Sequence, residues 1–412
     1  MLDRDDPSRR LSVLVVHNRY RLAGGEDGVV DAEIALLQQR GHRVERLTVD
    51  NRDLVDPTGI VDRLRLARDT VWSASAARMV AGASAAIGAD VVHIHNFVPQ
   101  LSPAIHGAAR SAGSAVVQTL HNYRLICPAA TLLRDGKPCQ DCRDLPVALP
   151  AVVHACYRGS RAQTTAIIAM LAVHRVRRTW TRDVDAFIAL TPFAAERIRA
   201  GGLPRARIAI KPNFVEAGAL QLDARREGLL YVGRLSEEKG VRVMLDAWQT
   251  LDLATTLRIA GDGPLAHLVR EAAAADPRIT MLGPISAEAV RSEMRRARML
   301  VAPSIWFEGL PLTIVEAFGA GLPVIASGHG SMLDIVHDER DGLLVTPGDP
   351  WSLVGAMRRA VEDDPLAGAL SRGARAEYGR TYTPEANYEL LMAIYRQALK
   401  HRNARQRGPA RA

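Results

Sequence analysis

The chain has few cysteines and few aromatic residues, and it lacks a long hydrophobic run. Its 412 residues include four cysteines, and aromatic side chains make up 5% of the sequence. No apolar run reaches the roughly 20 residues that a membrane-spanning helix needs. The first ten residues, MLDRDDPSRR, are polar and lack the apolar core of a signal peptide. We therefore expect a cytoplasmic protein, in which a structural disulfide is disfavoured.

The chain is long enough for more than one domain, and it carries an excess of basic residues. Its 412 residues predict two or three domains with sizeable hydrophobic cores. The net charge of +8 indicates an acidic partner, such as nucleic acid, anionic lipid or a phosphorylated substrate. The sequence contains no recognisable nucleic-acid-binding module and no basic stripe rich in aromatic residues. We therefore expect no nucleic-acid partner.

Strand patterns alternate with helix patterns along the chain, which predicts parallel sheets covered by helices on both faces. The series breaks near residues 215–228, a polar stretch without strong periodicity. We expect an α/β fold of two Rossmann-like, doubly wound parallel-sheet domains facing a central cleft, with ligands at the carboxyl ends of the strands. The predicted strands are Leu11–His17, Val44–Val49, Val91–His95, Ala115–Leu120, Ala186–Leu190, Arg207–Lys211, Leu229–Gly233, Thr256–Ala260, Ile279–Leu282, Met299–Ala302, Val324–Ala326 and Gly342–Val345.

The same break sets the expected domain boundaries. We place an N-terminal domain at residues 1–215, a linker at 216–228 and a C-terminal domain at 229–383. A final helix at 384–400 is expected to pack back on the N-terminal domain. The tail at 401–412 is basic and contains Gly and Pro, so we expect it to be disordered.

The segment from Glu308 to Glu316 places two carboxylates eight positions apart. Pro311 fits the first position of a helix, where a missing N–H carries no penalty, and Gly321 marks the end of that helix. Glu308 is therefore expected where a strand turns into a helix, with Glu316 about two turns along. The N–H groups of a helix start attract anions, phosphate above all. A carboxylate beside a phosphate would repel it unless the carboxylate binds another group, such as sugar hydroxyls.

Two further strand–helix turns carry cations or glycines. Arg234 and Lys239 flank the turn Gly233–Gly240, and together they suit a diphosphate. The alternative is a pair of solvated cations, but cations at a helix start oppose the helix macrodipole unless an anion is bound. Gly24 and Gly25 open a helix after the first strand and let backbone N–H groups approach a diphosphate. An ordinary turn explains the glycine pair equally well.

Two other features follow predicted strands. Gly261–Pro264 fits either the floor of a binding cleft or an ordinary turn. His121 ends the strand Ala115–Leu120. A histidine at the carboxyl end of a strand can hydrogen-bond a substrate hydroxyl, whereas a histidine taken singly is more often structural.

These motifs occur in the order that is typical of glycosyltransferase family 4, and the sequence resembles this family from about Leu11 to Tyr395. The paired glutamates and the Arg/Lys turn are the most specific parts of the resemblance. It implies a GT-B fold and transfer of a sugar from a nucleotide donor with retention of anomeric configuration. The positions that carry it are Gly24, Gly25, His121, Gly233–Gly240, Gly261–Pro264, Glu308 and Glu316.

The resemblance also implies a role for each matching residue. Arg234 and Lys239 would hold the donor diphosphate, and His121 would touch the sugar near its reacting end. Glu308 would contact the sugar hydroxyls. The remaining donor-binding groups would be Gly24 and Gly25, the backbone N–H groups of Gly309, Leu310 and Leu312, and Glu316 at the ribose. A UDP-sugar or GDP-sugar donor is implied, and no catalytic metal is expected because cations and helix starts can stabilise the leaving diphosphate.

The expected function is therefore a retaining, hexosyltransferase-type enzyme of bacterial polysaccharide or glycolipid assembly. Its acceptor would be lipid-linked or a polysaccharide precursor. One alternative is a non-catalytic protein that binds sugar nucleotides. Such a protein would keep Arg234 and Lys239 but need not keep Glu308. The other alternative is a different GT-B enzyme, such as a sugar-nucleotide epimerase.

All four cysteines fall in one short, loop-like segment at 127–156, within the N-terminal domain. A small loop with little core of its own benefits from a metal staple, and a Cys₄ set fits tetrahedral zinc. Unlinked thiols, or disulfides in an oxidising environment, are the alternatives. Similar loops occur in some bacterial relatives, but most of the family lacks them. The resemblance therefore implies no defined role for this loop. The candidate zinc ligands are Cys127, Cys139, Cys142 and Cys156.

The stretch Tyr157–Trp180 contains an apolar run, Ala166–Val173, flanked by arginines. It is too short to span a bilayer. A basic, partly apolar helix can lie on anionic lipid, so the protein is expected to be peripheral on the inner face of the cell membrane if its acceptor is lipid-linked. A buried helix with a solvated basic end is the alternative.

Overall fold

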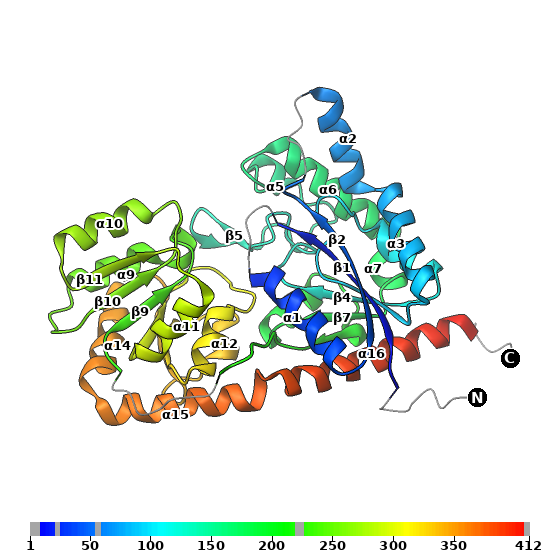
Figure 1. Cartoon of the computed structure of the whole chain (residues 1–412). Coiled ribbons are helices and arrows are strands. Elements are labelled where there is room, and N and C mark those ends of the chain that lie inside the picture. Colours follow the sequence, from blue (N-terminus) through cyan, green and yellow to red (C-terminus); the bar gives the residue numbers. More distant parts are fainter. Residues whose placement is uncertain (1–8, 21–24, 54–58, 219–225, 408–412) are drawn as a thin grey trace. The chain divides into compact units, whose positions relative to one another are not determined.

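The structure is a computed structural model that describes residues 9–20, 25–53, 59–218 and 226–407. The chain divides into two compact units, each built on a six-stranded parallel sheet (Figure 1). Unit 1 comprises Met1–Thr131, Gln140–Lys211 and Tyr388–Ala412, and unit 2 comprises Leu132–Cys139 and Pro212–Asn387.

The sheet of unit 1 has the strand order β2-β1-β3-β4-β7-β8, and every neighbouring pair is parallel. The order reverses between β1 and β3, which makes this pair the switch point of the sheet. The strands are β1 (Ser12–Arg19), β2 (Arg43–Asp50), β3 (Val91–Ile94), β4 (Ala115–Leu120), β7 (Ala186–Ala189) and β8 (Ile208–Ile210). The helices are α1 (Gly25–Gln39), α2 (Ile60–Val71), α3 (Ala74–Ile87), α4 (Ala104–Ser111), α5 (Leu149–Val153), α6 (Arg161–Val176), α7 (Thr179–Arg182), α8 (Pro192–Ala200) and most of α16 (Pro384–Arg407).

The central strands of unit 1 are apolar on both faces because helices cover both sides of the sheet. All residues of β3 and β4 are buried. On one face, α1 and α16 pack together against β1, so the C-terminal helix contributes Leu391 and Tyr395 to the core of unit 1. This helix continues past Lys400 to Arg407, because Leu399 is buried and His401 Nδ1 lies 2.9 Å from the Asp185 carbonyl oxygen.

The sheet of unit 2 has the strand order β11-β10-β9-β12-β13-β14, again entirely parallel. Counted along the unit this is the order 3-2-1-4-5-6 of doubly wound nucleotide-binding folds, with the switch point between β9 and β12. The strands are β9 (Leu229–Val232), β10 (Leu257–Ala260), β11 (Ile279–Gly283), β12 (Met299–Ala302), β13 (Val324–Ser327) and β14 (Gly342–Val345). The helices are α9 (Val241–Gln249), α10 (Ala266–Ala275), α11 (Ala287–Arg296), α12 (Leu312–Gly319), α13 (Met332–Ile335), α14 (Pro350–Glu362) and α15 (Asp364–Thr381).

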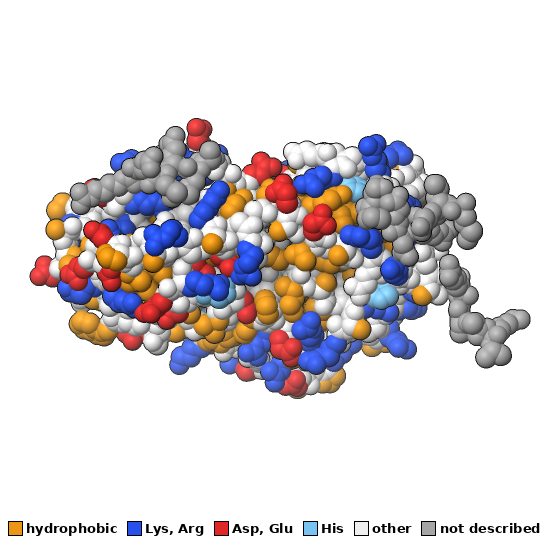
Figure 2. Space-filling model, turned by 90° about the horizontal axis from the view of Figure 1, so that it is seen from below, with side chains coloured by type: hydrophobic (Ala, Val, Ile, Leu, Met, Phe, Trp, Pro, Cys, Tyr) orange, Lys and Arg blue, Asp and Glu red, His pale blue; other side chains and the backbone are white. Residues whose placement is uncertain are grey.

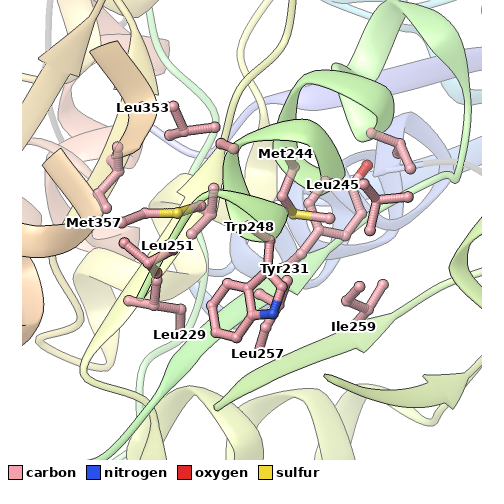
Figure 3. Close-up of a cluster of buried hydrophobic side chains, with 14 of the residues drawn as sticks. Leu229, Tyr231, Met244, Leu245, Trp248, Leu251, Leu257, Ile259, Leu353 and Met357 are labelled. Atoms are coloured by element: carbon pink, nitrogen blue, oxygen red, sulfur yellow. The ribbon is translucent and has the colours of Figure 1, made fainter. Parts of the chain in front are cut away.

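The core of unit 2 is centred on Trp248 of α9. Figure 3 shows its indole beside apolar side chains from α9 and the neighbouring strands, among them Tyr231 and Leu257. The indole N–H donates to Asp276 Oδ2 at 3.1 Å, so the one polar atom of the ring is satisfied. Met357 of α14 closes the same cluster, which ties α9 and α14 to one face of the sheet.

The predicted strands are confirmed, since each of the twelve coincides with a strand of one of the two sheets to within two residues at either end. The predicted fold class is confirmed with them. A short antiparallel hairpin, β5 (Leu133–Arg134) with β6 (Lys137–Pro138), was not predicted. Strands of two residues contain too little alternation to give a sequence pattern.

On the face that Figure 2 shows, Lys and Arg side chains lie among Asp and Glu side chains. Within the described residues, none of the helices is long and apolar enough to cross a membrane.

We expect Trp248→Ala to lower the free energy of unfolding by about 3–5 kcal/mol, because it leaves a large cavity in the core of unit 2. Trp351→Ala is the matched control, since Trp351 of α14 is 72% exposed. It should change stability by less than about 0.5 kcal/mol. Urea denaturation followed by circular dichroism measures both variants. Equal losses in the two variants would contradict the assigned core.

Candidate functional site

Three turns of unit 2 meet at the carboxyl ends of β9, β10 and β12. Gly240 has φ +73°, and a Cβ built on it would lie 1.9 Å from the carbonyl oxygen of Pro303. A Cβ on Gly261 would lie 1.9 Å from the carbonyl oxygen of Gly233. Only glycine fits such approaches. Gly240 therefore lets the turn after β9 close on the segment that follows β12, and Gly261 lets the turn after β10 close on the turn after β9. These turns lie at the switch point, where ligands bind in such sheets.

Lys239 and Glu308 form an ion pair at this switch point. Lys239 ends a short 3₁₀ turn, Glu237–Lys239, and its Nζ lies 2.7 Å from Glu308 Oε1. Ser304 donates its hydroxyl to the same oxygen at 2.7 Å. Glu308 is 5% exposed. A buried carboxylate is costly unless it is paired and hydrogen-bonded, and these two contacts meet that requirement.

The ion pair resolves the conflict that the sequence raised about a carboxylate beside a phosphate site. Lys239 compensates the charge of Glu308 locally, and an ammonium group carries three donors. It can therefore keep its bond to Glu308 and still donate to an anion. The pair is thus a buried carboxylate in contact with a cation that has further N–H groups to donate.

Sequence reasoning missed three neighbours of this pair, Ser304, Trp306 and His329. Lys239 Nζ lies 5.5 Å from the centroid of the Trp306 ring. His329 Nε2 lies 3.0 Å from the Ser304 carbonyl oxygen. Burial lowers the pKa of His329, so the ring is neutral at pH 7 and donates from Nε2 to this carbonyl. The sequence did contain signals that could have identified these neighbours: Ser304 and Trp306 lie between β12 and Glu308, and His329 follows β13.

Arg234 lies on the same turn, but its guanidinium pairs with Glu238 and not with Glu308. Its Nη2 is 2.6 Å from Glu238 Oε1, and its side chain is 56% exposed. Its backbone carbonyl accepts the Tyr231 hydroxyl at 2.8 Å, which fixes the main chain while the guanidinium remains in solvent. The structure brings Lys239 and Glu308 together and leaves Arg234 paired with Glu238.

The helix after Glu308 begins one residue later than expected. Pro311 has φ −68° and ψ 110°, an extended conformation, and serves as the N-cap of α12 instead of its first residue. Gly309 and Leu310 lie in the preceding loop, and Leu312 opens the helix.

Glu316 lies on α12, where burial raises the pKa of its carboxyl and Arg291 partly opposes this effect. A carboxyl with a raised pKa in a half-buried position suits hydrogen bonding to hydroxyl groups.

In unit 1, His121 follows β4 and lines a polar pocket at the carboxyl ends of β1, β3 and β4. Its Nε2 lies 3.0 Å from His95 Nδ1. Burial lowers the pKa of His121 well below its usual range, helped by the nearby His95 and His17, so the ring is neutral. The pocket wall includes Tyr20, His95, Asn96, Asn122, Arg124 and Tyr157.

Gly25 is the first residue of α1, and Gly24 lies outside the described residues. The first turn of α1 is acidic. Asp27 Oδ1 lies 2.7 Å from His17 Nε2. Burial raises the pKa of Glu26 to about 8, although a hydrogen bond from Tyr20 opposes the shift. Because Glu26 is protonated at pH 7, the first turn of α1 carries less negative charge than its two acidic residues, Glu26 and Asp27, indicate.

The four cysteines are half-buried thiols. In the described segments, two groups of side chains hold their potential ligand atoms within 4.8 Å of one another, and neither group includes a cysteine. The zinc site stays a prediction from the sequence, which metal analysis of protein purified without chelator tests.

Two family models match the chain. A model of a "Glycosyl transferase 4-like domain" matches residues 24–213, and a model of "Glycosyl transferases group 1" matches residues 226–363. The two matches cover nearly all strands of both sheets. The chain therefore belongs to the family 4-type glycosyltransferases, as the sequence motifs predicted.

Individual relatives match over part of their length. A D-inositol 3-phosphate glycosyltransferase from Nocardioides sp. is 31% identical over 191 residues, which are 41% of this chain and 41% of that protein. A phosphatidyl-myo-inositol mannosyltransferase from Mycobacterium leprae is 28% identical over 245 residues, 56% of this chain and 64% of that protein. The matches thus span less than two thirds of these relatives' own length.

Solved structures match over almost the whole chain. Anabaena Alr3699/HepE in complex with UDP and glucose has a TM-score of 0.63 at 16% identity, covering 93% of this chain and 99% of that one. A sucrose-phosphate synthase from Thermosynechococcus elongatus has a TM-score of 0.65 at 19% identity, with coverage of 95% and 100%. At such identities the likeness shows the fold alone, which is GT-B.

Because the folded state keeps Glu26 protonated up to about pH 8, whereas an unfolded carboxyl ionises near its ordinary pKa of 4.5, the wild type should lose stability between these values. We expect its unfolding free energy, relative to Glu26→Gln, to fall by up to about 1.4 kcal/mol per pH unit from about pH 5 to 8. Urea denaturation at several pH values measures this. Glu45→Gln, at an exposed position on β2, is the control, and its unfolding free energy should depend on pH as that of the wild type does. The raised pKa of Glu26 would be contradicted if the unfolding free energies of Glu26→Gln and the wild type changed in parallel with pH.

Proposed function

We propose that this protein is a retaining glycosyltransferase that moves a sugar from a nucleoside diphosphate sugar to a lipid-linked or polysaccharide-precursor acceptor. The observation that carries this proposal is the Lys239–Glu308 pair at the switch point of unit 2. A cation with spare donors and a carboxylate with sugar-binding oxygens are the two groups that a sugar diphosphate needs side by side.

Each predicted donor-site residue of unit 2 has a task in this proposal. Lys239 holds the diphosphate, Glu308 the sugar hydroxyls and Glu316 the ribose hydroxyls. Backbone N–H groups of Gly309, Leu310 and Leu312 face the phosphates from the start of α12. Arg234 joins them by exchanging its exposed bond to Glu238 for a phosphate, since an exposed pair of this kind is worth at most about 1 kcal/mol.

The remaining predicted residues lie in unit 1. We propose that Gly24 and Gly25 bind the diphosphate and that His121 binds the sugar near its reacting carbon. A UDP-sugar is the donor we favour, with a GDP-sugar second, because Alr3699/HepE, which shares the fold, is known in complex with UDP-glucose. Support for a glycan acceptor comes from another relative, a putative colanic acid biosynthesis glycosyltransferase from Escherichia coli that is 27% identical over 216 residues.

The chemistry is mainly electrostatic. The bond between the anomeric carbon and the phosphate oxygen breaks, and the leaving diphosphate gains charge that Lys239 and the α12 N–H groups stabilise. The acceptor hydroxyl attacks the same face of the sugar, forms the new glycosidic bond and gives its proton to the departing phosphate oxygen. Retention of configuration follows. Trapping of a covalent glycosyl–enzyme adduct would reject this step.

Contact with the inner membrane surface belongs to the same proposal. On α6, Val176 is 84% exposed beside Arg175 and Arg177, and on α2, which packs against α6, Ile60 is 75% exposed. Apolar side chains among arginines suit the boundary of an anionic lipid layer.

A thermal-shift screen against UDP-, GDP-, ADP- and dTDP-sugars, followed by assays for released nucleotide, tests the function. We expect stabilisation by a UDP-sugar and nucleotide release that rises when a lipid or glycan acceptor is added. Stabilisation without release would favour a non-catalytic binding protein. Conversion of the donor sugar without any acceptor would favour an epimerase.

Lys239→Ala should lower kcat by roughly two or more orders of magnitude, because it removes a donor aimed at the charge that grows on the diphosphate. Lys400→Ala on α16 is the matched control and should leave kcat unchanged. Initial rates at saturating donor, with circular dichroism to confirm folding, measure both. An unchanged rate in a folded Lys239→Ala protein would refute the role of Lys239.

A further inference from the structure

A buried charged cluster lies directly behind His121 in unit 1, and neither the sequence motifs nor the proposed function uses it. Its centre is Glu33 of α1, which is 1% exposed. Lys211, also 1% exposed, follows β8 and places its Nζ 2.9 Å from Glu33 Oε2. The second carboxylate oxygen, Oε1, faces His93 Nδ1 at 3.0 Å and His95 Nε2 at 3.4 Å. Burying an ion pair here has no evident structural gain, since apolar residues of similar volume stabilise a core as well.

The protonation state of the cluster follows from its charges. Despite burial, Lys211 and His93 hold the pKa of Glu33 well below its usual range, so Glu33 is a carboxylate and an acceptor only. Burial lowers the pKa of His95 to about 3, so that ring is neutral and carries one proton. The neutral His95 ring therefore carries its proton on either Nδ1 or Nε2, and this tautomer decides which nitrogen faces His121 as a donor or an acceptor.

The contact to Glu33 decides that choice. Glu33 Oε1 and His95 Nε2 lie 3.4 Å apart, and among the described residues neither buried atom has a partner that meets the strict geometry of a hydrogen bond. A proton on His95 Nε2 places positive charge beside the carboxylate, whereas a lone pair there would face a negative charge. His95 therefore carries its proton on Nε2 and offers a lone pair from Nδ1. Since Nδ1 lies 3.0 Å from His121 Nε2, that nitrogen of His121 must be the donor.

We propose that Glu33 and His95 are positioning residues that fix His121 in the Nε2-protonated tautomer, so that its Nδ1 serves as a hydrogen-bond acceptor for a substrate hydroxyl. His121 lines the polar pocket of unit 1, where such a hydroxyl would bind. This proposal rests on the proposed transfer function for the identity of the hydroxyl-bearing ligand. The order of proton donors, from His121 to His95 to Glu33, rests on the geometry of unit 1 alone.

The first test reads the tautomer directly in the ligand-free protein. In ¹⁵N-histidine NMR spectra, with His121→Gln to assign the signals, we expect His121 to be protonated at Nε2 and not at Nδ1. A proton on Nδ1 would overturn the proposal. This readout needs no substrate, so it stands even if the protein transfers no sugar.

The second test reverses the order of donors. In Glu33→Gln, Lys211 attracts the amide oxygen, which turns the amide N–H₂ towards His95. His95 then accepts at Nε2 and donates from Nδ1, so His121 should switch to the Nδ1-protonated form. We expect kcat to fall by at least about tenfold, in the direction of the loss of about 10⁴-fold that follows when an amide replaces the carboxylate orienting a catalytic histidine. A switched tautomer with unchanged kcat would overturn the positioning role, as would an unswitched tautomer in the folded variant.

Tyr388→Phe is the matched control, because it removes a hydroxyl 2.8 Å from His42 Nε2 in the same unit, away from the pocket. It should leave both the His121 tautomer and kcat unchanged. If it lowered kcat as Glu33→Gln does, the loss would reflect general loosening of unit 1 and would overturn the proposal.

Discussion

The contact between Lys239 and Glu308 is the interaction on which the proposed donor site of unit 2 depends. A buried carboxylate needs a cation, and a diphosphate needs a cation that still has N–H groups to donate. A 2.7 Å pair with a three-donor ammonium satisfies both conditions. The pair exists because β9 and β12 are neighbours in the sheet and because Gly240 lets the turn after β9 touch Pro303. Fold topology and a single missing Cβ thus set the chemistry of the site.

Unit 1 applies the same principle with different groups. Its buried carboxylate, Glu33, is also paired with a lysine, and its second oxygen faces two histidines. In unit 2 the ion pair itself is the proposed contact to the ligand. In unit 1 the ion pair does not contact the ligand in our proposal, because His95 lies between Glu33 and His121.

The sequence predicted the fold well because both sheets are parallel and buried on both faces, so that each strand reads as a short continuous apolar run. It also singled out Lys239, Glu308 and Glu316 as candidate site residues, because they stand in motifs that are typical of the family, and their roles stay predictions. It did not predict the pairing of Lys239 with Glu308, nor the relation among Glu33, His95 and His121. These contacts join residues from different strands and helices, and only the tertiary structure brings them together. The start of α12 was misplaced by one residue because Pro311 suits both the N-cap and the first helical position.

A crystal structure of the chain with bound UDP tests the central claim most directly. The account predicts diphosphate oxygens within hydrogen-bond distance of Lys239 Nζ and of the N–H groups at the start of α12, with Glu308 still in contact with Lys239. A diphosphate bound away from residues 239 and 308–316 would contradict it.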